Sequence, residues 1–141
     1  MRGILTDVNC QGHFQILQRL FADTSRGELW AFLSLEILTF NDLGLALDIS
    51  DRYLWQICQQ HDLVLITANR NADGPESLEA TIQELNTPLS LPVVTLANVE
   101  RIRRDRQYAE QVADQILDLL FDIDNLLGTG RLFVPWGLAG K

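Results

Sequence analysis

Residues 63–67, with the sequence LVLIT, constrain the fold of this 141-residue chain more than any other segment. An uninterrupted apolar and β-branched run of this length is typical of a strand that is buried on both faces, as in a parallel sheet covered by helices. Shorter runs of similar character occupy residues 4–6, 36–40, 93–96 and 132–134. Amphipathic helical patterns lie between them, for example Phe14, Leu17 and Phe21 at spacings of three and four. Strands that alternate with helices predict a parallel sheet.

We therefore expect a single α/β domain over residues 1–141, with a Rossmann-like three-layer α/β/α arrangement around a central parallel sheet of four to five strands. The stretch 29–35 fits a helix or a strand, and we interpret it as a short helix, whereas 41–44 is a predicted turn. Ser50 is a predicted N-cap, with Asp51 in the first turn of the helix that follows. One long helix is expected over residues 99–123, and an apolar C-terminal tail over 131–141.

The charge balance limits the classes of function. Lys and Arg number 11 and Asp and Glu number 19, and the resulting net charge of −8 argues against a protein whose whole surface binds nucleic-acid phosphates. An acidic site for a divalent cation stays compatible with this charge. The chain has only two cysteines and lacks both a long apolar span and the layout of a signal peptide, so we expect a cytoplasmic protein with no membrane contact.

Oxygen-bearing side chains follow the predicted strands. They are Asp7 and Asn9 after the first strand, Asp42 after the second, Thr67, Asn69 and Asp73 at and after the end of the third, and Asn98 and Glu100 after the fourth. Asp51 follows the exit loop of the second strand and belongs to the same edge. Parallel sheets bind ligands at the carboxyl ends of their strands, and Mg²⁺ and Mn²⁺ prefer oxygen ligands. The pattern favours a Mg²⁺ or Mn²⁺ site, although Asp and Asn are also common in turns for backbone reasons.

Taken in order, several of these segments resemble the small bacterial PIN-like proteins. The segments are Thr6-Asp7-Val8-Asn9, Asp42-Leu43-Gly44-Leu45, Ser50-Asp51 at a helix start, and Val64-Leu65-Ile66-Thr67-Ala68-Asn69 at a strand end. The likeness covers residues 3–74, about half of the chain. It implies a Rossmann-like parallel sheet flanked by helices. It also implies the activity of that family's active members, which are metal-dependent ribonucleases and in many cases toxins with a partner antitoxin.

The resemblance places Asp7 and Asp51 at acidic positions of the family. Asn69 stands where the family usually has Asp, and its amide oxygen offers a metal no negative charge. Asp73, in the loop that follows, is the candidate for the missing carboxylate. The expected polar neighbours of these carboxylates are Asn9, Thr67, Asn69 and Asp42.

Two charged runs and the tail lie outside that motif set. Arg101, Arg103, Arg104 and Arg106 form a basic patch at the start of the expected long helix, where they oppose the helix dipole; the alternatives are binding of RNA phosphates or pairing with nearby acids. Glu110, Asp114, Asp118 and Asp122 recur every four residues, as a solvated helix face or a docking surface for a basic partner. The apolar segment 133–138 either docks on its own domain or marks a dimer or partner contact.

The leading hypothesis is a PIN-like ribonuclease that uses Mg²⁺ or Mn²⁺ to hydrolyse phosphodiester bonds of single-stranded RNA. As a toxin-type nuclease it would have an antitoxin-like protein partner, and a homodimer is a further expectation. Asp7, Asp51 and Asp73 would be the catalytic metal ligands, and the RNA-binding residues would be Arg70, Arg101, Arg103 and Arg104. The alternative is a catalytically inactive PIN-like module that binds a protein partner or RNA.

Overall fold

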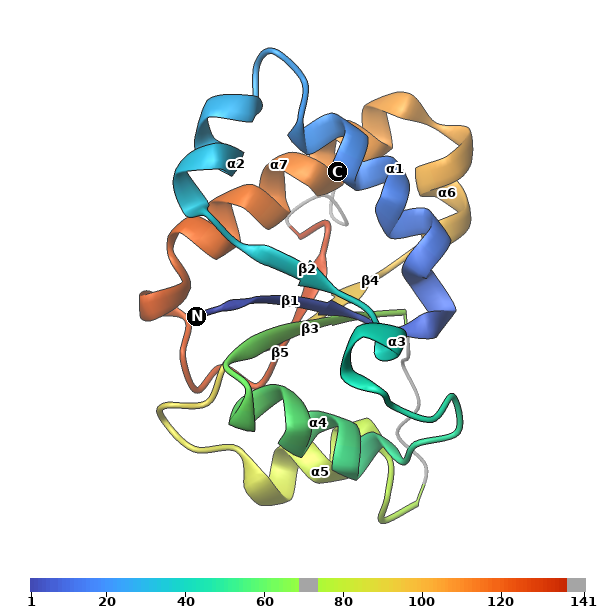
Figure 1. Cartoon of the computed structure of the whole chain (residues 1–141), viewed down its shortest axis with the longest axis vertical. Coiled ribbons are helices and arrows are strands. Elements are labelled where there is room, and N and C mark those ends of the chain that lie inside the picture. Colours follow the sequence, from blue (N-terminus) through green and yellow to red (C-terminus); the bar gives the residue numbers. More distant parts are fainter. Residues whose placement is uncertain (69–73, 137–141) are drawn as a thin grey trace.

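A parallel sheet of five strands runs through the centre of the protein, in the order β2-β1-β3-β4-β5 (Figure 1). The structure is a computed structural model and describes residues 1–68 and 74–136. The strands are β1 (Gly3–Thr6), β2 (Glu36–Leu38), β3 (Leu63–Thr67), β4 (Val93–Leu96) and β5 (Arg131–Val134). All four strand pairs are parallel, so the predicted α/β class with a parallel sheet of four to five strands is confirmed.

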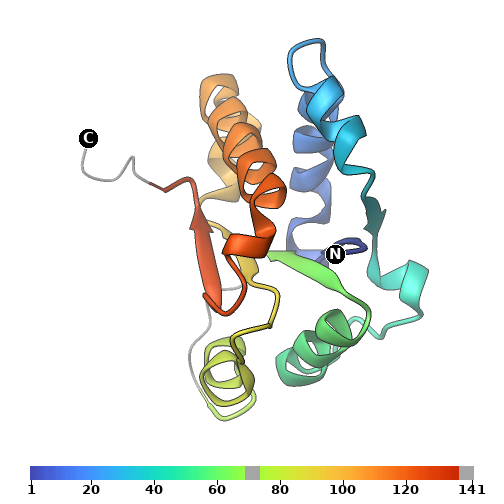
Figure 2. The ribbon, with the colours of Figure 1, turned by 90° about the vertical axis from the view of Figure 1, so that its left-hand side faces the viewer.

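Helices cover both faces of the sheet, as Figures 1 and 2 show. One face carries α1 (Gln11–Phe21), α2 (Gly27–Leu33), α6 (Val99–Arg104) and α7 (Arg106–Phe121), and the other carries α4 (Asp51–Gln60) and α5 (Leu78–Leu85). Val64 and Ile66 of β3 pack into the first layer, and Leu63 and Leu65 pack into the second. Residues 63–67 are apolar without a break because both faces of β3 are buried. None of the helices in the described ranges is long and apolar enough to cross a membrane.

The path of the chain places a reversal of strand order between β1 and β3. From β1 the chain reaches β2 by way of α1 and α2, and then returns past β1 by way of α4 to β3. Thr6 pairs in register with Ile66, so the two strands end side by side. Ligands of doubly wound sheets bind at the carboxyl ends of the strands that flank such a reversal. The edge after Thr6 and Thr67 is therefore the position favoured for a site.

The two crossovers that follow β3 run over different faces. The chain passes from β3 to β4 by α5, on the α4 face, and from β4 to β5 by α6 and α7, on the α1 face, although both steps move the same way along the sheet (Figure 2). Their hands are therefore opposite, and one of them departs from the strong preference for right-handed connections. As a consequence, α6 packs beside α1.

The expectation of one long helix over residues 99–123 is wrong, because residues 99–121 form two helices, α6 and α7. Asp105 separates α6 from α7, and its backbone is extended, with φ −130° and ψ 105°. Its carboxylate accepts a hydrogen bond from the Tyr108 amide at 3.2 Å and caps α7. Ile102 and Ala109, on either side of the break, are both buried. The apolar periodicity therefore continues through Asp105, and the sequence pattern does not indicate the break. A short 3₁₀ turn, η2 (Ile123–Asn125), follows α7.

The region after β2 also differs from the expectation. The strand ends at Leu38, and the predicted turn is a short helix, α3 (Phe40–Leu43). Thr39 and Asp42 form a capping box that starts this helix, and Gly44 ends it with φ 67°, a conformation that glycine adopts without strain. The helix at 29–35 and the Ser50 cap are confirmed as α2 and the start of α4. The expected tail is described only as far as Trp136, as β5 and the two residues after it.

Candidate functional site at the ends of β1 and β3

Asp7 is the first residue after β1 and is nearly buried, with 7% of its surface exposed. Its Oδ2 atom accepts a hydrogen bond of 2.7 Å from the Thr67 hydroxyl, at the last residue of β3. The Asp7 amide donates to the Ile66 carbonyl at 2.9 Å, which continues the β1–β3 ladder by one residue. Backbone and side chain together therefore fix the Asp7 carboxylate at the reversal point.

Asp51 supplies a second negative charge near Asp7. It opens α4, whose position is set by Ser50: the Ser50 hydroxyl accepts a hydrogen bond of 3.1 Å from the Tyr53 amide. Burial raises the pKa of the Asp7 carboxyl, the Thr67 hydroxyl lowers it, and the charge of Asp51 raises it again. A carboxylate whose ionisation is disfavoured by burial and by a neighbouring negative charge is one that a divalent cation would stabilise.

Two of the expected polar neighbours have local structural partners. The Asn9 side-chain oxygen accepts a hydrogen bond of 3.2 Å from the Ala68 amide, and so holds the backbone just after β3 against the start of α1. The Asp42 carboxylate accepts a hydrogen bond of 2.8 Å from the Thr39 amide in the capping box. Asp42 therefore caps a helix, whereas Asn9 belongs to the edge that carries Asp7.

Three of the predicted site residues, Asn69, Arg70 and Asp73, lie outside the described residues. Within residues 1–68 and 74–136, no group of three or more His, Cys, Asp or Glu side chains is placed to hold a metal ion. The described part of the site thus offers two carboxylates, from Asp7 and Asp51, with the Thr67 hydroxyl beside Asp7.

The arginines of α6 lie at the same edge of the sheet, because α6 follows the carboxyl end of β4. Arg101, Arg103 and Arg104 are exposed. The Arg101 guanidinium lies 4.5 Å from the centre of the Tyr108 ring, and its Nε atom lies 3.3 Å from Asp105 Oδ2. Pairing with a nearby acid, which the sequence left open, is thus present for Arg101.

His13 belongs to this edge and was not among the residues predicted for the site. Its Nε2 atom lies 3.1 Å from Arg103 Nη2 and 3.4 Å from Glu100 Oε2. Residues of α1 and α6 meet because these helices follow β1 and β4 and share one face of the sheet. The sequence predicts that each helix follows a strand. It does not predict the face of the sheet on which α6 lies, so this contact could not be predicted.

Both cysteines belong to the core. Burial raises the pKa of Cys10 and that of Cys58 to about 12. The Cys10 thiol donates a hydrogen bond of 3.4 Å to the Ile66 carbonyl. Because a thiolate is the form that ligates metals, neither sulfur is a ready metal ligand near neutral pH.

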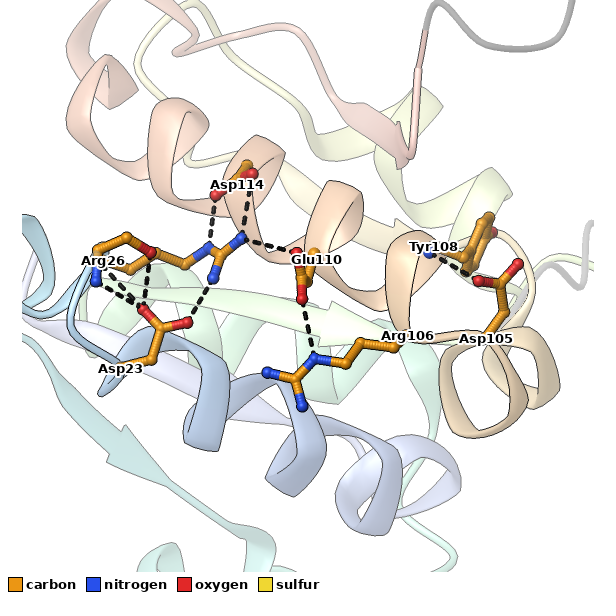
Figure 3. A network of polar contacts seen from close by, with 8 residues as sticks. Asp23, Arg26, Asp105, Arg106, Tyr108, Glu110 and Asp114 are labelled. Carbon is orange, nitrogen blue, oxygen red and sulfur yellow. Dashed lines mark hydrogen bonds and ion pairs between the residues drawn. The ribbon is translucent and has the colours of Figure 1, made fainter.

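The acidic stripe of α7 divides into two halves. Figure 3 shows Arg26, from the N-cap of α2, between Asp23, Asp114 and Glu110, with Arg106 on the other side of Glu110. Arg26 Nε lies 2.6 Å from Asp114 Oδ1, and Arg106 Nε lies 2.8 Å from Glu110 Oε2. This half of the stripe is accessible to solvent, as expected, and its ion pairs also tie α7 to the segment between α1 and α2. The other half, Asp118 and Asp122, is exposed and forms no ion pair within the described residues.

Comparisons of the chain with protein-family models, with curated proteins and with solved structures found no significant match.

Proposed function

We propose that this chain is a PIN-like domain that binds Mg²⁺ or Mn²⁺ and hydrolyses phosphodiester bonds of single-stranded RNA. The observation that carries the proposal is the proximity of Asp51 to the nearly buried Asp7 at the reversal point of the sheet. Buried ionisable groups with a raised pKa and a specific charge neighbour concentrate at functional sites.

The donor set suits a hard divalent cation. Carboxylate oxygens of Asp7 and Asp51 are the preferred ligands of Mg²⁺ and Mn²⁺, which usually retain several waters. The cation would also offset the effects of burial and of the Asp51 charge, which together raise the pKa of Asp7. When bound, a divalent metal polarises a phosphodiester and lowers the pKa of a coordinated water.

The protein's own residues would position the reactants. The Thr67 hydroxyl donates a hydrogen bond to Asp7 Oδ2. This bond fixes the rotamer of the carboxylate and therefore the position of its other oxygen, Oδ1. The Asn9 amide fixes the backbone that leaves β3 at Ala68. Arg103 and Arg104, exposed on α6 at the same edge, would bind phosphates on either side of the cleaved bond.

A cleavage assay tests the proposal. Wild type, Asp7→Asn, Asp51→Asn and Asp124→Asn are incubated with a fluorescent single-stranded RNA, with Mn²⁺ or with EDTA. Asp124 is an exposed acid of η2, before the amino end of β5, and its substitution makes the same charge change away from the site. We expect Mn²⁺-dependent cleavage by wild type and Asp124→Asn, and a loss of about 100-fold or more in the two site variants. Cleavage that survives both site substitutions would refute the proposed site.

The inactive PIN-like module predicts a different result. It would bind RNA or a protein partner through the same edge with no cleavage under any metal, and Asp7→Asn would leave binding unchanged. A filter-binding measurement on the same four proteins, alongside Arg103→Gln, therefore separates the two functions.

A further inference from the structure

A pocket of about 440 Å³ lies between α7 and the edge strand β5, and it shares no residue with the site at Asp7. Its apolar walls come from Leu119 on α7, from Leu132 and Phe133 on β5, and from Trp136. Cavities of this size, lined by apolar and aromatic side chains with a few polar groups, are typical of small-molecule sites.

Hydrogen bonds fix the backbone of Trp136, which lines this pocket. The Gln115 side chain on α7 binds both backbone groups of Trp136: its Nε2 donates to the Trp136 carbonyl at 3.0 Å, and its Oε1 accepts from the Trp136 amide at 2.7 Å. The Trp136 side chain nevertheless stays 46% exposed. A wall that is held in place before a ligand arrives lowers the ordering cost of binding.

Arg131 fixes the β5 side of the pocket in a similar way. Its Nη1 atom donates to the Thr95 hydroxyl at 2.8 Å, and its Nε lies 3.2 Å from Glu79 Oε1. The guanidinium carbon lies 5.6 Å from the centre of the Phe133 ring. Glu79 offsets the charge of Arg131, so the pocket lining, which holds Arg131 together with Asp118 and Asp122, keeps a net negative charge.

Those acids are Asp118 and Asp122, which line the pocket one helical turn apart. Unlike Glu110 and Asp114 on the same stripe, they form no ion pair within the described residues. The mouth of an apolar pocket therefore carries two negative charges. A second copy of the chain would bring a second pair of these acids to the same place, and repulsion between like charges disfavours that occupant.

We propose that this pocket binds a small molecule that joins a ring-sized apolar group to a protonated amine or amidine. The ring would lie against Trp136 and Leu132, and the cation would lie between the Asp118 and Asp122 carboxylates. Both attractions are of known type, burial of apolar surface against aromatic side chains and ion pairing with carboxylates. Asp122 Oδ1 accepts a hydrogen bond of 2.6 Å from the neutral Asn125 side chain, which leaves the negative charge of Asp122 in place.

Three indole probes that differ in charge test the proposal: tryptamine, its neutral alcohol analogue tryptophol, and the anion indole-3-propionate. Each is titrated into the ¹⁵N-labelled full-length chain, and amide shifts give both the affinity and the place of binding. We expect tryptamine to bind most tightly, with shifts confined to residues near 115–136. The double variant Asp118→Asn/Asp122→Asn should weaken tryptamine about fivefold to tenfold, the effect of one or two exposed ion pairs, and leave tryptophol within about twofold.

Trp136→Ala should weaken both tryptamine and tryptophol, whereas Asp124→Asn, an exposed acid outside the pocket lining, should weaken neither. Circular dichroism and the melting temperature confirm that each variant is folded. The proposal is overturned if no probe shifts the pocket amides at millimolar concentration, if tryptophol binds as tightly as tryptamine, or if Trp136→Ala changes nothing. Sedimentation that shows a wild-type dimer and a monomeric Trp136→Ala would instead assign the pocket to a second copy and would also overturn it.

Discussion

Asp7→Asn should stabilise the metal-free protein and, at the same time, abolish its stabilisation by Mn²⁺. Ionisation of Asp7 costs free energy in the folded protein, because this carboxyl is only 7% exposed and lies near the charge of Asp51. Asn has almost the same shape and keeps a carbonyl oxygen that can accept the Thr67 hydroxyl hydrogen bond. The substitution therefore removes the disfavoured charge without a cavity, and it gives up part of the hydrogen bonding that the Val8 and Asn9 amides donate to the carboxylate.

The two effects are large enough to measure. An unfolding entropy of about 2.1 cal/mol/K per residue gives about 0.3 kcal/mol per degree for this chain. A gain of about 1 kcal/mol, the usual scale of a single substitution, would raise the melting temperature of metal-free Asp7→Asn by about 3 °C. Mn²⁺ at ten times its Kd would stabilise the wild type by about 1.4 kcal/mol, or about 5 °C, and would not stabilise Asp7→Asn.

The assay is thermal unfolding followed by circular dichroism, with EDTA or with MnCl₂, for wild type, Asp7→Asn and Asp124→Asn. A pH series adds a second readout. Because the pKa of Asp7 is raised in the folded state, the folded protein binds more protons than the unfolded chain between the ordinary carboxyl pKa and the raised one. The stability of metal-free wild type should thus fall as pH rises through that window, and Asp7→Asn should reduce the slope. Stabilisation by Mn²⁺ should grow over the same window, since it needs the carboxylate.

The opposite signs make this prediction easy to contradict. If Asp7→Asn destabilises the metal-free protein, Asp7 is a structural group whose charge the fold needs. If Mn²⁺ raises the melting temperature of Asp7→Asn as much as that of wild type, the cation binds elsewhere. Asp124→Asn should behave as wild type in both conditions, and a shift there of similar size would mean that net charge, not the site, explains the result.

Three further substitutions test the surroundings of the site. Thr67→Val removes the hydroxyl that lowers the pKa of Asp7, so it should move the pH midpoint of Mn²⁺ binding upward and cost about 1 kcal/mol of stability in urea unfolding. Ser50→Ala should cost about 1 kcal/mol through loss of the α4 cap and should weaken Mn²⁺ binding, measured by calorimetry, because Asp51 is the next residue. Arg26→Met should lower stability by about 1 kcal/mol, with a difference from wild type that shrinks at high salt, and leave RNA cleavage unchanged.

The sequence predicted those parts of the structure that depend on local periodicity and capping. Residues 63–67 are a fully buried strand, as the unbroken apolar run indicated. Ser50 caps α4 because a hydroxyl one residue before a helix can accept an amide hydrogen bond from its first turn. Such features need no knowledge of what lies across the sheet.

The errors occur where one residue serves two competing local structures. Asp105 follows the six helical residues of α6 and precedes a second helical pattern. Its carboxylate accepts a hydrogen bond as the N-cap of α7, an interaction that it could not make in the middle of an uninterrupted helix. From the sequence, Asp42 fits either a turn or the candidate site. In the structure it forms a capping box with Thr39 that begins the helix α3. Arg26 gave no signal at all, because its partners on α7 are more than 80 residues away in the sequence.

The composition of the candidate site depends on two facts of topology that no local pattern contains. Asp7 and Asp51 come together only because β3 returns to pair with β1 after the chain has visited β2. Arg103 reaches His13 only because the last crossover runs over the α1 face; over the α4 face, the same arginines would lie beside Asp51 instead. Asp51, at the start of α4, and the arginines of α6 thus belong to opposite faces of the sheet, with Asp7 at the edge between them. A phosphodiester laid across this edge would meet the carboxylates with a metal on one side and the arginines on the other. Charge-reversing substitutions on the two faces should accordingly impair different steps: Arg103→Glu the affinity for RNA, and Asp51→Lys the binding of Mn²⁺.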